Sequence, residues 1–96
     1  FIMDEERTTE EIAQIYTVAG DSVSLINADA NYAAYKTANP TSSLTETEWK
    51  AMIKRNTDHL EIIKAYKKTD GTTSIWTTES FTDIDAAITK GKTLYA

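Results

Sequence analysis

The chain has 96 residues, a formal net charge of −5, one histidine and no cysteine. This length suits one domain with a single modest core, and the lack of cysteine excludes disulfides and thiolate-based metal or catalytic sites. One histidine excludes a histidine-rich metal site, and no apolar run approaches the ~18 residues of a membrane-spanning helix. We therefore expect a cytoplasmic protein that has no cofactor, no bound metal, no membrane partner and no secretory signal peptide.

The first predicted helix covers about residues 9–27. Thr8 and Glu11 have the spacing of a capping box, in which each side chain bonds to the other residue's free backbone N–H. Apolar residues then recur every three or four positions, namely Ile12, Ile15, Tyr16, Ala19, Val23 and Ile26. Gly20 weakens this helix by about 1 kcal/mol relative to alanine and is the position where a break is expected first. Residues 1–7 are expected to be irregular.

A second, shorter helix is predicted from Asn31 to Lys36. Asp29 is the expected cap at its start, and Asn39 ends it, because a residue that precedes proline is displaced from the helical region. Tyr32 and Tyr35 lie three positions apart on this helix and are candidates for an exposed surface that binds another protein. The alternative is that both rings pack on the next helix, and the sequence favours neither.

The longest predicted helix covers about residues 45–68, and we expect it to be the central element of the fold. Thr45 and Glu48 repeat the capping-box spacing at its start. Its apolar side chains fall on one broad arc, formed by Trp49, Met52, Ile53, Leu60, Ile63 and Tyr66.

The basic side chains of this helix are candidates for contacts with nucleic acid. Four of them share one face and two lie at its sides: Lys50, Lys54, Lys64 and Lys68, with Lys67 and Arg55. Such a row can neutralise phosphates, and a short helix followed by a long one is compatible with a helix-turn-helix. A solvated helix face, attracted to the acidic first half of the chain, is the simpler explanation.

Two polar residues lie on or beside the apolar arc of the same helix. The adjacent Asp58 points about 100° away from His59, so the two do not form a catalytic dyad, and His59 is expected to be half-buried with one hydrogen bond. Asn56 needs a hydrogen-bond partner because an unpaired buried amide is costly. We expect Asn56 to anchor the core, bonded to a loop carbonyl near residues 71–77, rather than to line a binding groove.

The rest of the chain is predicted to be an extended linker and a last helix. Gly71 suits the turn after the long helix, and in the linker, residues 69–81, Ile75 and Trp76 are expected to fill the core. Thr82 is the expected cap of a helix over about 82–90, extending at most to 95. Together the elements predict an all-α single domain, residues 1–96, of three or four helices packed on the long one.

Several stretches of the sequence resemble small uncharacterised proteins of marine bacteriophages and ocean metagenomes. The resemblance rests on residues 55–62, 76–79 and 86–91, and on the helix from Ile15 to Asn27. It transfers no catalytic residue. It implies a viral or environmental origin, a non-enzymatic accessory role, and association with the virion if the gene belongs to a phage.

The sequence thus predicts a non-enzymatic binding or assembly module that contacts another protein or a second copy of itself. The alternative is a nucleic-acid-binding domain that uses the basic face of residues 49–68. An enzyme is not predicted, because the chain has no glycine-rich phosphate loop, no serine nucleophile elbow and no zinc-protease motif.

Overall fold

The computed structural model describes residues 9–68 and 70–96, with side chains from residue 14 onward. Within these ranges the chain forms four helices and no strand: α1 (Thr9–Asn27), α2 (Tyr32–Ala38), α3 (Glu46–Lys64) and α4 (Thr78–Tyr95). The predicted all-α fold of three to four helices is confirmed. The expected irregular segment 1–7 and the expected capping box of Thr8 and Glu11 lie outside the described residues and side chains.

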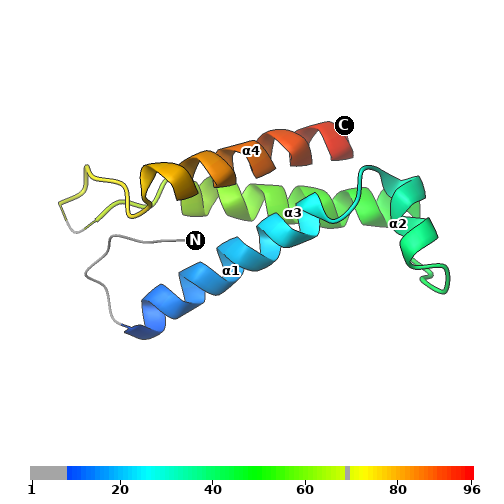
Figure 1. Cartoon of the computed structure of the whole chain (residues 1–96), viewed down its shortest axis with the longest axis horizontal. Coiled ribbons are helices and arrows are strands. Elements are labelled where there is room, and N and C mark those ends of the chain that lie inside the picture. The colour runs from blue at the N-terminus through cyan, green and yellow to red at the C-terminus, as the bar shows by residue number, and fades with distance from the viewer. Residues whose placement is uncertain (1–8, 69) are drawn as a thin grey trace.

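The three longer helices α1, α3 and α4 lie side by side along the long axis, and α2 turns away at one end (Figure 1). The resulting body is elongated, with extents of 46 × 24 × 19 Å. α1 covers the predicted range and continues through Gly20 without a break. α3 has 19 residues, as α1 has, and is central because it contacts each of the other helices rather than because of its length.

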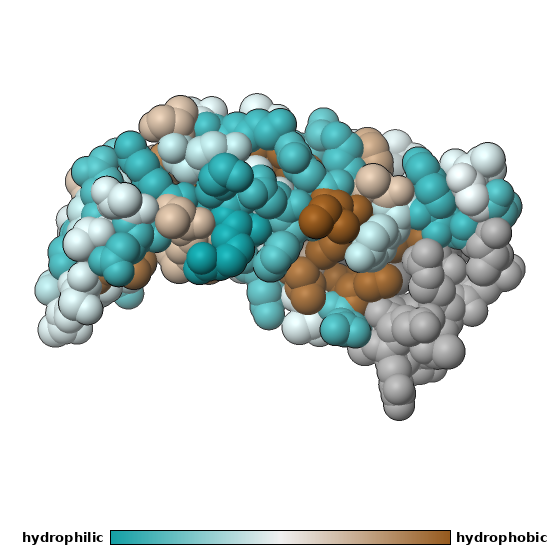
Figure 2. All heavy atoms as spheres, turned by 180° about the vertical axis from the view of Figure 1, so that it is seen from behind, coloured by the Kyte–Doolittle hydropathy of each residue, from teal (hydrophilic) through white to brown (hydrophobic). Residues whose placement is uncertain are grey.

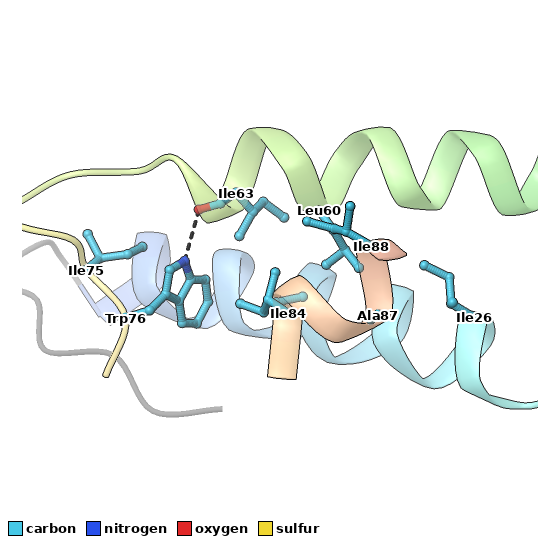
Figure 3. Close-up of a cluster of buried hydrophobic side chains, with 9 residues drawn as sticks. Ile26, Leu60, Ile63, Ile75, Trp76, Ile84, Ala87 and Ile88 are labelled. Carbon is cyan, nitrogen blue, oxygen red and sulfur yellow. Dashed lines mark hydrogen bonds between the residues drawn. The ribbon is translucent and has the colours of Figure 1, made fainter. Parts of the chain in front are cut away.

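The hydrophobic core lies where α1, α3 and α4 meet. Ile26, Leu60 and Ile84, one from each helix, are fully buried, and removal of such side chains from water is the main stabilising term of a small domain. As predicted, the loop before α4 adds Ile75 and Trp76 to the core. The indole Nε1–H of Trp76 donates a hydrogen bond to the Ile63 carbonyl at 2.9 Å, which fixes this loop to the end of α3 (Figure 3).

The start of α3 agrees with the prediction, whereas α2 begins one residue later than predicted, at Tyr32, and its cap is two residues later. Thr45 Oγ1 accepts a hydrogen bond from the Glu48 N–H and the Thr45 N–H donates to Glu48 Oε1, each at 3.1 Å, which is a complete capping box. At α2 the cap is Asn31 and not Asp29, because Asn31 Oδ1 accepts from the Ala34 N–H at 2.9 Å. Asp and Asn both cap helices well, so residue type alone does not show which of the two positions is the cap.

α3 ends at Lys64 instead of continuing to residue 68. Beyond it the chain folds back on itself: Lys67 and Ser74 form an isolated antiparallel bridge, and the Lys68 N–H donates to the Thr73 carbonyl at 2.7 Å. This pairing requires extended backbone at 67 and 68, so the last predicted turn of the helix is replaced by a tight loop. Gly71 lies in that loop with a φ of 75°, as expected for a turn glycine.

α4 begins at Thr78, earlier than the predicted start near Thr82. Thr77 is the cap, and its hydroxyl oxygen accepts a hydrogen bond from the Ser80 N–H at 3.3 Å. Thr82 instead lies inside the helix, where its hydroxyl donates to the Thr78 carbonyl at 3.0 Å. The extended linker is therefore shorter than expected.

The connection between α2 and α3 does not have the length of a helix-turn-helix. It covers the seven residues 39–45, whereas that motif uses a turn of three or four residues. α2 ends at Ala38, two residues beyond the predicted Lys36 and directly before Asn39 and Pro40, which the sequence predicts to end it.

Candidate functional site

The predicted basic row lies along the edge of the contact between α3 and α4. Lys64 Nζ is 2.6 Å from Asp85 Oδ1 on α4 and 5.3 Å from the ring centre of Phe81. At the other end of α3, Lys50 Nζ donates to the carbonyl of Ala96 at 3.3 Å. These lysines therefore contribute to the packing of α4 on α3.

The middle of the same edge is also charge-paired. Lys54 Nζ is 2.7 Å from Asp58 Oδ2 and lies 5.8 Å from the ring centre of Tyr95. The hydrogen bond to Asp58, together with its charge, raises the pKa of Lys54 above its usual value. Lys92 of α4 reaches Glu61 of α3 at 2.6 Å, and this bond likewise raises the pKa of Lys92. A row expected to face solvent is thus largely neutralised by its own neighbours.

The other predicted basic residues do not extend this row. Lys67 and Lys68 follow α3 in the paired loop, so helical spacing no longer applies to them. Arg55 is exposed on the side of α3 that faces α1, since it lies four residues before His59 and seven before Ile62. The six candidates are therefore distributed over three parts of the surface.

Tyr32 and Tyr35 pack against α3, which is the second alternative considered for them. Both side chains are half-buried, and their ring centres lie 6.0 Å and 6.3 Å from that of Trp49. Both hydroxyls form hydrogen bonds: that of Tyr32 donates to the Leu44 carbonyl at 2.5 Å, and that of Tyr35 bonds to Ser42 Oγ at 2.7 Å. This aromatic cluster attaches α2 to the start of α3.

Asn56 anchors the core, as predicted, but to a different partner. Its Oδ1 accepts a hydrogen bond from Ser22 Oγ on α1 at 3.0 Å, and its Nδ2 donates to the Met52 carbonyl at 2.9 Å. The prediction for His59 is wrong: its side chain is exposed and makes no hydrogen bond within the part of the chain that the structure describes. Among the described helices, α1 covers this side of α3 and leaves His59 at the rim.

An open groove of about 610 Å³ lies between α1 and α3, beside His59. Side chains of both helices line it: Gln14, Ile15, Val18, His59, Ile62, Ile63 and Tyr66. Ile62 is 58 % exposed, and hydrophobic side chains gather in one patch on this half of the molecule (Figure 2). The lining combines apolar side chains with one imidazole, one amide and one phenol, and it contains no carboxylate or nucleophile pair. Such a groove is suited to binding an apolar surface.

The apolar spacing in the sequence does not predict this groove. Ile62 falls outside the apolar arc of its helix, next to the exposed Glu61 and near the exposed Arg55. A large aliphatic side chain on the polar side of an amphipathic helix was the available signal, because exposed apolar patches mark interaction sites.

The described residues offer no arrangement for a metal ion or a membrane span. In residues 9–68 and 70–96, no three His, Asp or Glu side chains are grouped so that they could hold a metal. No helix within the same ranges combines the length and hydropathy that a bilayer crossing requires.

No protein-family model, curated protein or solved structure matches the chain. The resemblance to marine phage proteins and the accessory role that it implies therefore stay predictions.

Proposed function

We propose that this chain is a non-enzymatic module that binds a helical segment of a protein in the groove between α1 and α3. The observation that carries the proposal is Ile62, an isoleucine left 58 % exposed beside partly buried Ile15 and Val18. Exposure of such a side chain forfeits much of the roughly 1.5–3 kcal/mol that its burial contributes. A bound apolar surface recovers that energy.

The shape of the groove favours a helix as its occupant. Two neighbouring helices leave a channel into which the ridge of a further helix fits, as in four-helix bundles. An amphipathic helix would place apolar side chains at positions i, i+3, i+4 and i+7 over Ile15, Val18 and Ile62. Gln14 and His59 lie at the lining as hydrogen-bonding groups that can fix its register.

Protein binding is supported better than nucleic-acid binding by the distribution of charge. Lys54 and Lys64 are each within 2.7 Å of a carboxylate of the chain itself, so phosphates would have to displace internal partners. The groove lining carries no lysine or arginine.

The proposal is tested with a panel of labelled peptides that form amphipathic helices, measured by fluorescence anisotropy. We expect peptides with apolar residues at i, i+3, i+4 and i+7 to bind the chain, and shuffled versions of the same peptides not to bind. Ile62→Lys should remove this binding, because it places a charge in the apolar groove. The matched control is Ala86→Lys, at an exposed position of α4, which should leave the binding unchanged.

Circular dichroism of both variants establishes that each is folded. The proposal fails if no peptide of the panel binds, or if folded Ile62→Lys binds the peptides as the parent chain does.

A further inference from the structure

We propose that the groove is occupied by a second copy of this chain, which makes the protein a two-fold symmetric dimer. This inference rests on the proposed function, since it names the helices that pack against the groove, α1 and α3 of a second copy. It starts from the positions of two charges just beyond the groove lining, one on each of the two helices that form the groove.

Asp21 on α1 and Arg55 on α3 lie at nearly the same height, just beyond the residues that line the groove. The two helices run in opposite directions (Figure 1), and the 3.0 Å hydrogen bond between Ser22 Oγ and Asn56 Oδ1 fixes their relative height. Asp21 and Arg55 immediately precede these two bonded residues, so in antiparallel helices they are offset by about 3 Å along the axis. Asp21 follows Val18 by three residues and Arg55 precedes Ile62 by seven, so both lie on the groove side of their helices. An acidic and a basic side chain therefore flank one end of the groove.

Neither of these charges is satisfied within the described part of the chain. Both side chains are exposed, and no ion pair or hydrogen bond engages them there. In contrast, Lys54 and Lys64 on the far side of α3 each have a carboxylate partner. Asp21 and Arg55 are thus two exposed, opposite charges beside the end of the apolar groove, available to a partner.

A two-fold axis parallel to the helices makes this surface complementary to itself. Such an axis places α1 of each copy against α3 of the other without a shift in height. Asp21 then meets Arg55 of the partner subunit, and the symmetry creates this pair twice. At the other end of the groove, Val18 approaches Ile62 of the partner subunit. Apolar contact supplies the affinity, and the two ion pairs select the orientation.

The test is sedimentation velocity of the full chain over a concentration series, from about 1 μM to about 500 μM, which covers dissociation constants of modest interfaces. We expect a dimer that Ile62→Lys converts to a monomer. Asp21→Arg and Arg55→Asp should each raise the dimer dissociation constant about tenfold, because two ion pairs become repulsive. The double variant D21R/R55D should restore the parent constant, since the exchanged charges match again.

Asp83→Arg is the matched control for Asp21→Arg. It makes the same change of charge at an exposed position of α4, away from the groove, and should leave the dimer unchanged. A double variant that stays as weak as the single ones contradicts the proposed symmetry. A dimer that is insensitive to Ile62→Lys has its interface elsewhere and overturns the inference.

The peptide panel separates this inference from the function on which it rests. A chain that is monomeric at every concentration but binds the helical peptides at Ile62 refutes the second copy and keeps the protein-binding function. A monomer that binds no peptide refutes both.

Discussion

Gly91 is the residue on which the close approach of α4 to α3 depends. A Cβ atom at this position would overlap Thr57 Oγ1. Thr57 is fully buried, and its hydroxyl donates to the Ile53 carbonyl at 2.8 Å, so its side chain is held in place. The absence of a side chain at residue 91 thus sets the distance between the two helices.

Gly91→Ala should lower the free energy of unfolding by about 1–3 kcal/mol, the usual cost of inserting a methyl group into a filled core. Urea unfolding followed by circular dichroism measures it. Adding Thr57→Ala should recover part of the loss, because it removes the atoms that the new methyl group meets.

The chain contains its own control for this substitution. Gly20 lies inside α1 with open space around it, so Gly20→Ala should raise the free energy of unfolding by about 0.5–1 kcal/mol through helix propensity alone. Equal effects of the two substitutions would show that helix packing at Gly91 is not tight.

The capping box of α3 links the stability of that helix to pH. Hydrogen bonds from the Thr45 backbone N–H and hydroxyl group hold the pKa of Glu48 below its ordinary value of 4.5. A carboxyl whose pKa is lowered by folding stabilises the folded state above its unfolded pKa, and this stabilisation is lost as pH falls through the folded pKa. The contribution is therefore complete at neutral pH and disappears below pH 4.5.

Glu48→Gln should reduce the loss of stability on acidification while keeping a hydrogen-bonding group at the cap. The measurement is urea unfolding of the parent chain and the variant at pH 7 and at about pH 3, below the ordinary carboxyl pKa. An identical fall in stability for both proteins would show that Glu48 is not coupled to folding.

Helices defined by local signals were predicted well from the sequence, and those limited by distant contacts were not. The range of α1 follows from apolar spacing, and the start of α3 from Thr45 and Glu48, which lie within one helical turn. The end of α3 depends on pairing between Lys67 and Ser74, and no spacing rule for helices reports such a pairing. The surroundings of the candidate site residues were predicted less well than the helices, because they depend on which other helix covers each residue.

The basic edge between α3 and α4 illustrates this point for the whole molecule. The sequence correctly places Lys50, Lys54 and Lys64 on one face of a helix, but it does not show that α4 lies along that face with Asp85. Considered on α3 alone, this row suggests a phosphate-binding surface. In the fold it belongs to the contact between α3 and α4.

We therefore expect replacement of Lys50, Lys54, Lys64 and Lys68 by glutamine to lower the midpoint of thermal unfolding slightly, since exposed ion pairs contribute little individually. We expect neither the parent chain nor the quadruple variant to bind mixed-sequence duplex DNA. Anisotropy of labelled duplex at increasing salt is the measurement. Steeply salt-dependent binding that the quadruple variant removes would instead favour the nucleic-acid-binding alternative.

The attachment of α2 by three aromatic rings has a consequence for engineering of the chain. None of the seven residues of α2 is fully buried, so the interior shared by α1, α3 and α4 does not need this helix. Melting of α2 is then a local event that requires less free energy than global unfolding. Pro40 and Thr41, both exposed at the tip beyond α2, are accordingly where an inserted tag or reporter domain should be tolerated best.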